Sequence, residues 1–259
     1  MNKLISLTKL VFFLSAICLF TISCSDDDHN TPVKKPSTVI EKVRITKSTT
    51  KVDYQTVLTF SYDSSNRLTK VHADSPLASI NYTYSKDSKV NYNYASENST
   101  LVEMKTTLEN GRSYMCTFSN KENAATYSYD NSGYLGLCNN NGIVLEYTWE
   151  KGNLKAITTT PRGAYNSEFH TSAIANSYSL DLNTLPQLID ERTDYTTVMN
   201  TYGQMAGFLG KRSANLVEDT YYTYDYSFYQ DGRLKEITLQ TSTGEKYAFR
   251  IEYTDNALE

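Results

Sequence analysis

Hydrophobic and polar residues alternate along most of the chain. In the stretch NYTYSKDSKVNYNYA, Tyr82 and Tyr84 precede a polar turn, and Tyr92 and Tyr94 follow it. In TYYTYDYSFYQ, every second residue from Tyr222 to Phe228 is aromatic. A period of two is typical of β-strands that have one packed face and one face in water. The pattern therefore predicts a series of antiparallel strands.

A loose repeat joins these strands: an aromatic strand end, a polar turn, then Leu and a further strand. Each turn contains Asn, Asp or Gly, the residues that close hairpins most readily. One hairpin is only marginally stable, so about a dozen strands are expected to share one face and to curl, because flat sheets of that width are rare. The copies are YDSSNRLTKV (62–71), YDNSGYLGL (129–137), YTWEKGNLKAI (147–157) and YQDGRLKEI (229–237).

We therefore predict a mainly all-β fold. Its core is a single large curled antiparallel meander sheet, porin-like or a partly closed barrel, with one short helical insertion packed on the concave side. The strands lack a consistent outward apolar band and aromatic girdles, which disfavours a transmembrane barrel.

The alternation breaks between residues 161 and 219, where the helical insertion is expected. Helical spacing is seen there in a set of apolar residues that ends before Gly210, namely Val198, Tyr202, Met205 and Leu209. Lys211 and Arg212 follow. They have two interpretations: a pair that binds an anionic ligand, or a basic cap that favours the helix C-terminus.

The N-terminus reads as an export signal. Lys3 and Lys9 form a short positive region before an apolar run, 10–20, that is too short to span a bilayer. The next residues, Thr21-Ile22-Ser23-Cys24, resemble a lipobox, in which the cysteine is lipidated and becomes the first mature residue. Thr21 departs from the Leu that is usual there, so ordinary cleavage that leaves a free Cys24 thiol is the alternative. The predicted organisation is a signal peptide at 1–23, an acidic and polar tether at 24–38, and one β domain at 39–259.

Lipidation at Cys24 would make outer-membrane lipid a partner and would hold the protein firmly without a spanning segment. The segment that follows is a serine and three aspartates, Ser25, Asp26, Asp27 and Asp28. They resemble the export signal of surface lipoproteins in Bacteroidetes-type bacteria. This resemblance implies the cell surface; the alternatives are a plain solvated tether and a domain that faces the periplasm.

Composition narrows the function further. Without residues 1–23 the chain keeps 23 basic residues against 29 acidic ones, a net charge near −6. This balance disfavours nucleic acid as a partner. Two cysteines remain in the domain, Cys116 and Cys138. A possible disulfide and two isolated buried thiols are both consistent with the sequence.

No pattern of catalytic residues is evident. His72 and His170 are the histidines of the β domain, and neither belongs to a metal-binding, nucleophile or nucleotide motif. Each is expected to be a surface or structural histidine. We expect no catalytic residues, no metal and no cofactor, and hence no enzyme.

The repeat copies resemble the YD repeats of bacterial Rhs-type proteins. Across most of the mature chain the sequence resembles more closely a family of Bacteroidetes lipoproteins of unknown function with a porin-like fold. The lipobox, the tether and the Tyr-rich hairpins carry that resemblance. So do two late motifs, DLN (181–183) and GFLGKRSANL (207–216). It implies a fold and no function.

Three functions fit these observations. The first is a surface-exposed lipoprotein that binds an extracellular polysaccharide or protein, because tyrosine offers a flat apolar face and a hydroxyl. Exposed aromatic side chains at strand ends would support it. The alternative is a structural or accessory subunit of an outer-membrane complex that docks on an envelope protein. The third is a glycan-degrading enzyme, which needs two facing carboxylates in a cleft.

Overall fold

The computed structural model describes residues 38–48, 54–74, 79–86, 89–96, 99–118, 121–140, 142–160, 166–189, 195–219 and 222–255. The chain divides into two compact units, Met1–Lys35 and Pro36–Glu259. All described residues belong to the second unit. The predicted signal peptide, and the tether as far as residue 37, lie outside them.

The described residues form one antiparallel sheet of seventeen strands. The first half contains β1 (Ile40–Ser48), β2 (Tyr54–Tyr62), β3 (Leu68–Ala73), β4 (Ser79–Tyr84), β5 (Lys89–Ser96), β6 (Ser99–Glu109), β7 (Arg112–Phe118), β8 (Lys121–Tyr129) and β9 (Leu135–Asn140). The second half contains β10 (Ile143–Glu150), β11 (Asn153–Thr160), β12 (Asn166–Glu168), β13 (His170–Ala175), β14 (Asn215–Asp219), β15 (Tyr222–Phe228), β16 (Leu234–Thr241) and β17 (Lys246–Tyr253). Two helical segments interrupt the series, the 3₁₀ helix η2 (Leu182–Ile189) and α2 (Tyr195–Met205).

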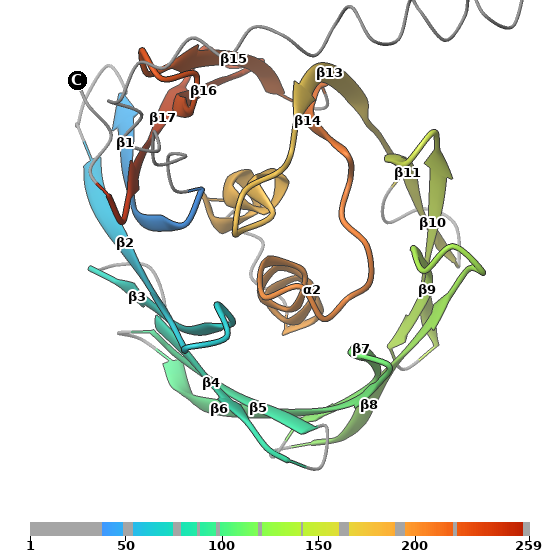
Figure 1. The fold of residues 1–259 in the computed structure, drawn as a ribbon. Helices are drawn as coiled ribbons and strands as arrows, with labels where there is room; N and C mark the ends of the chain where they lie inside the picture. The colour runs from blue at the N-terminus through green and yellow to red at the C-terminus, as the bar shows by residue number, and fades with distance from the viewer. Residues whose placement is uncertain are drawn as a thin grey trace, which may run out of the picture. The chain divides into compact units, whose positions relative to one another are not determined.

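The sheet is a meander that curls until its ends meet. Each strand from β1 to β11 pairs with the next one along the chain. The last strand, β17, pairs over its whole length with β1, from Lys246 opposite Ser48 to Tyr253 opposite Ile40. Figure 1 shows the resulting ring of strands around the two helical segments. The predicted fold class is confirmed.

Strand pairing around the ring is weakest between β11 and β15. β12 and β13 are two parts of one stretch of chain, the first paired with β11 and the second with β14. Among the described residues, β14 meets β15 at one aligned position, Asp219 opposite Thr223. The strands continue around the ring, but the described residues pair at few positions along this seam, so the sheet is a partly closed barrel.

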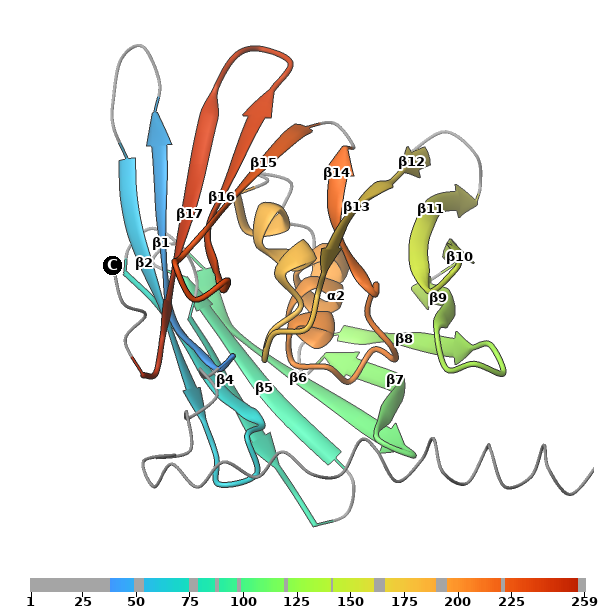
Figure 2. The ribbon, with the colours of Figure 1, turned by 45° about the horizontal axis from the view of Figure 1, so that its top comes forward.

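The inner face of the sheet is a packed core. Along β17, exposed Lys246 is followed by buried and half-exposed residues that alternate from Tyr247 to Tyr253, as a period of two requires. Leu182 and Leu185 of η2 and Tyr202 of α2 belong to the same buried cluster as the inward strand residues. The helical segments therefore plug the concave side, as Figure 2 also shows from a second direction.

Two details of the prediction need correction. The described sheet has seventeen strands rather than about a dozen, and three of them, β12, β13 and β14, lie inside the segment 161–219 that was expected to be helical and loop. The helical part is confined to η2 and α2. The three strands inside this segment are short, at three, six and five residues, so they carry little alternation.

Tyrosines at the strand ends explain much of the tyrosine excess. The turns at 63–67, 110–111, 130–134, 151–152 and 229–233 all lie at one end of the antiparallel sheet, which we call the turn rim. Near it, tyrosine rings pack inward while their hydroxyls donate to backbone carbonyls of nearby strands. The pairs are Tyr62 with Ile40 (2.8 Å), Tyr84 with Leu68 (2.8 Å), Tyr129 with Ser113 (2.6 Å), Tyr229 with Ile251 (2.7 Å) and Tyr253 with Leu234 (2.8 Å).

The YD repeat thus has a structural meaning. Its tyrosine links a hairpin to a neighbouring strand, and burial raises the pKa of Tyr62 to about 12, so its hydroxyl stays a donor at neutral pH. The aspartate that follows shapes the turn, since Asp63 Oδ1 accepts from the backbone N–H of Ser65 (2.9 Å) and Asp130 Oδ1 from that of Tyr134 (2.9 Å). The copies at 62–71 and 129–137 therefore each stabilise one turn of the rim.

Candidate binding pocket

The helix α2 ends earlier than the sequence predicted. It stops at Met205, and the chain reverses at Gly207, whose φ is +84°. The backbone N–H of Phe208 donates to the carbonyl of Gly203 (3.1 Å), the bond of a glycine-terminated helix end. The predicted continuation of the helix to Leu209 is wrong because Gly207 favours this left-handed conformation. Leu209 is nevertheless buried in the core, as its spacing suggested.

Residues 207–216, which we call the strap, run from the end of α2 to the wall of the ring. The strap is bonded to three successive hairpins near the rim. The carbonyl of Phe208 accepts from the N–H of Ser113 (2.7 Å), the N–H of Lys211 donates to Gly133 (3.0 Å), and the N–H of Ala214 donates to Gly152 (2.9 Å). These bonds fix the backbone from which Lys211 and Arg212 project.

The two late sequence motifs meet where the strap joins the sheet. Asn183, in the DLN motif, donates through its side chain to the carbonyl of Asn215 (3.0 Å) and accepts from the N–H of Val217 (3.0 Å). Its amide thus pairs with β14 as a neighbouring strand would. Asn176 reinforces the junction through a bond to the carbonyl of Ser213 (3.3 Å).

Asp181 is the buried acid of this junction. Its Oδ1 accepts from Asn176 Nδ2 (2.7 Å) and from the N–H of Asn183 (3.1 Å). Its Oδ2 accepts from Gln204 Nε2 (3.0 Å). Burial raises the pKa of this carboxyl above its ordinary value, although these donors and the charge of Arg212 oppose the rise. The carboxyl is therefore held firmly, but its charge is costly.

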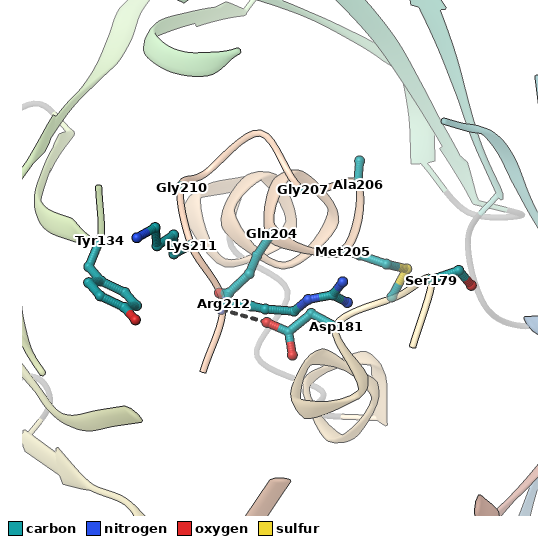
Figure 3. A pocket seen from close by; sticks show the side chains of 10 residues that line it. All are labelled: Tyr134, Ser179, Asp181, Gln204, Met205, Ala206, Gly207, Gly210, Lys211 and Arg212. Carbon is teal, nitrogen blue, oxygen red and sulfur yellow. Dashed lines mark hydrogen bonds between the residues drawn. The ribbon is translucent and has the colours of Figure 1, made fainter. Parts of the chain in front are cut away.

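A pocket of about 370 Å³ opens beside Asp181. Its lining comes from the 130–134 turn, the start of η2, the end of α2 and the strap, and Figure 3 shows the ten residues. Lys211 extends toward Tyr134 at one end of the pocket, whereas the Arg212 side chain extends the other way, above Asp181. The two cations therefore face different parts of the pocket and do not form a single clamp.

Neither cation forms an ion pair with a described residue, although the charge of Arg212 acts on the nearby Asp181. Among the residues that the structure describes, no carboxylate lies within ion-pair distance of Lys211 or Arg212, and the Arg212 guanidinium donates no hydrogen bond. Lys211 Nζ lies over the ring of Tyr134, 5.3 Å from its centroid. Arg212 is half-buried and Lys211 is exposed.

The interpretation of these residues as a helix cap is wrong. No basic residue lies in the last turn of α2, and both cations come after the reversal at Gly207. The other interpretation, contact with an anionic ligand, stays a prediction.

Polar groups without protein partners complete the pocket. Within the described part of the chain, nothing donates to Gln204 Oε1, and the Tyr134 hydroxyl makes no hydrogen bond. The Tyr134 ring packs against Trp149 with centroids 4.7 Å apart, and the indole N–H of Trp149 donates to the carbonyl of Leu135 (2.7 Å). This pair holds Tyr134 in place, so its hydroxyl has a fixed position.

Cys116 and Cys138 are both buried, and they do not form the possible disulfide. Cys116 pairs with Ala125 and Cys138 pairs with Tyr127, which places β8 between them. Two strand spacings amount to about 10 Å, beyond the roughly 7 Å that a disulfide tolerates between Cα atoms. Burial raises the pKa of Cys138 to about 11, which makes it an unreactive thiol.

We predict that both thiols survive in air-oxidised protein. Alkylation under denaturing but non-reducing conditions should modify Cys116 and Cys138 alike, as measured by peptide mass spectrometry. Recovery of the two peptides as one crosslinked species would contradict the strand register.

The other predicted residues lie away from the pocket. Cys24 and the acidic segment Ser25–Asp28 fall outside the described residues. His72 is exposed on β3, where Nδ1 lies 3.2 Å from Ser79 Oγ, and His170 is exposed at the start of β13. In the part of the chain that is described, no three metal-ligating side chains come together, and neither helix is both long and apolar enough to cross a bilayer.

The expected support from exposed aromatics is weak. Of the described side chains, the large exposed hydrophobic ones are Tyr114, Leu137, Ile143 and Phe228. Two of these four are aromatic, whereas most described tyrosines pack wholly or partly into the core. The described tyrosines are thus mainly structural.

Sequence reasoning missed several pocket residues, namely Tyr134, Ser179, Asp181 and Gln204. The DLN motif contains Asp181, and it was noted beside the strap motif, but nothing in the sequence shows that these segments touch. Gln204 lies on α2, one position before its last residue, Met205. The sequence predicted this helix but did not mark Gln204 as a binding residue.

These features define the class of protein: a curled, mainly β barrel with a helical plug and a polar inner pocket. No family model matches the chain, and no curated protein matches it. Among solved structures, a porin-like protein from Bacteroides uniformis aligns with a TM-score of 0.59 and 16% sequence identity, over 82% of this chain and 98% of that one. The likeness shows that the fold is porin-like.

Proposed function

We propose that this protein is a lipid-anchored, surface-exposed binding module for extracellular glycan, without enzymatic activity. The observation that carries the proposal is the pocket at the strap, where Lys211, Arg212, Gln204 and Tyr134 present polar groups that no described residue uses. Unused, fixed donors and acceptors in a concave site are what a hydroxyl-rich ligand requires.

The dimensions of the site support a small ligand or the end of a polymer. The pocket volume of about 370 Å³ lies near the lower end of the range for small-molecule sites, about 300–1,000 Å³. The strap and the turn rim hold its lining through backbone hydrogen bonds, so the site exists before a ligand arrives. A preformed site loses little conformational entropy on binding.

The direct test is a glycan array probed with the full chain carrying Cys24→Ser, which prevents lipidation. Binding to a defined group of glycans, lost when the pocket is altered, is the expected result. A blank array together with a protein that co-purifies in stoichiometric amount would overturn the proposal in favour of an accessory subunit.

The surface address predicts a protease-shaving result. In intact cells the wild-type domain should be digested. A Cys24→Ala variant should be released, and a variant with Asp26, Asp27 and Asp28 replaced by Ala should be protected, because it keeps the anchor and loses the export signal. Immunoblotting of the domain measures all three. Protection of the wild type until the outer membrane is opened would place the domain in the periplasm.

A further inference from the structure

We infer that the pocket recognises an acidic sugar, with the carboxylate of a uronic acid bound to Arg212 and its hydroxyls bound to Gln204 and Tyr134. This inference rests on the proposed function and deepens it by naming the class of glycan. Three observations on the pocket carry it.

The first observation is the state of Arg212. Its guanidinium is half-buried, lines the pocket and makes no hydrogen bond or ion pair with described residues. A guanidinium has five N–H donors in a planar fork that matches a carboxylate. Because described residues use none of these donors, they are available to a ligand carboxylate.

The second observation is the charge of the site. Lys211 and Arg212 line it with one acid, Asp181, which already accepts three hydrogen bonds from other residues. The pocket therefore carries a net positive charge in a domain whose sequence is acidic overall. A neutral sugar would gain nothing from this charge, whereas an acidic sugar would.

The third observation is the set of groups suited to hydroxyls. Gln204 Nε2 is occupied by Asp181, which fixes the amide and turns its free Oε1 into an acceptor. The Tyr134 hydroxyl is free to donate or accept and is held by the ring contact with Trp149. Asp181 thus acts as a positioning residue for Gln204. A carboxylate flanked by hydroxyls is the chemistry of a uronic acid.

The test is isothermal titration calorimetry with oligomers of galacturonic, glucuronic and mannuronic acid. Each is compared with the same oligomer after its carboxylates have been reduced to alcohols. The full chain carrying Cys24→Ser is the protein. We expect one acidic oligomer to bind, and its reduced form to bind at least tenfold more weakly.

The variants locate the carboxylate. Arg212→Gln should weaken acidic-oligomer binding at least tenfold and Arg212→Lys by less, because lysine keeps the charge but loses the fork. Lys211→Gln should weaken it about two- to threefold, since Lys211 is exposed. Lys105→Gln, which removes an exposed charge from β6, is the matched control and should change nothing. Circular dichroism melts verify that each variant is folded.

The outcomes separate the two proposals. Equal binding of acidic and reduced oligomers, unaffected by Arg212→Gln, overturns the acidic-sugar inference and leaves glycan binding intact. Binding of none of the oligomers, nor of any glycan on the array, overturns both. If inorganic sulfate binds as tightly as the acidic oligomers and depends on Arg212, the site is a general anion site and the sugar assignment is wrong.

Discussion

Gly210→Ala is expected to destabilise the domain by about 3–4 kcal/mol and to abolish ligand binding at the pocket. Gly210 has a φ of +86°, where an alanine costs about 1–2 kcal/mol. An added Cβ would also lie 2.8 Å from the carbonyl oxygen of Gly133 and 2.8 Å from the ring of Tyr129. Urea denaturation monitored by tryptophan fluorescence measures the loss.

Neither neighbour can move easily to relieve this contact. The Gly133 carbonyl accepts the hydrogen bond from the Lys211 backbone, and Tyr129 is held by its hydroxyl bond to Ser113. Relief would therefore displace the strap, which carries Lys211 and Arg212.

Gly207→Ala is the matched control. Gly207 has nearly the same φ, +84°, but no atom lies within 4 Å of a Cβ built there. It should lose only the conformational term, about 1–2 kcal/mol. Equal losses at the two positions would mean that the close approach at Gly210 contributes nothing.

Asp181→Ala is expected to lower the free energy of unfolding by about 3 kcal/mol. It would leave one buried donor, on Asn176, and two part-buried donors, on Asn183 and Gln204, without this acceptor. Each unsatisfied donor costs about 1–3 kcal/mol, but removing a carboxylate that is itself costly to bury offsets part of the sum. Asp181→Asn keeps an acceptor for Asn176 and Asn183, so it should lose only about 1 kcal/mol.

The same residue predicts a pH dependence. Because burial raises its pKa in the folded state, Asp181 retains a proton over a pH range in which the unfolded chain has lost it. Its contribution is complete below the unfolded pKa and is lost as the pH rises through the folded pKa. The stability of the wild type should therefore decline relative to Asp181→Asn as the pH rises from about 4 toward neutrality. A constant difference between the two proteins over that range, by urea denaturation, would contradict a raised pKa.

The sequence was informative where structure depends on neighbours along the chain. The alternation predicted strands because one face of each strand packs against the core. The turn residues Asp63 and Asp130 also predicted the hairpins in which they lie. The helical spacing of Tyr202 and Met205 likewise predicted the plug. The end of that helix was misplaced because an apolar spacing continues to Leu209 across the reversal at Gly207.

The pocket could be predicted only in part, because it depends on contacts between distant segments. Lys211 and Arg212 stood out in the sequence as adjacent charges. Asp181 did not, because only the fold brings the start of η2 close to the strap. The fate of the cysteines was equally hidden. Only the strand register shows that β8 separates Cys116 from Cys138.

The pairing of β1 with β17 has a consequence for how the domain is made. Arg44 and Glu252 are hydrogen-bonded partners although they lie 208 positions apart, so the first strand to be synthesised must wait for the last. Contacts this distant form slowly, and unpaired strand edges attract other chains in the meantime. A chain that ends before Lys246 would leave both β1 and β16 with an open edge. The final eight-residue strand thus covers the edges through which a newly synthesised chain is expected to pair with other chains.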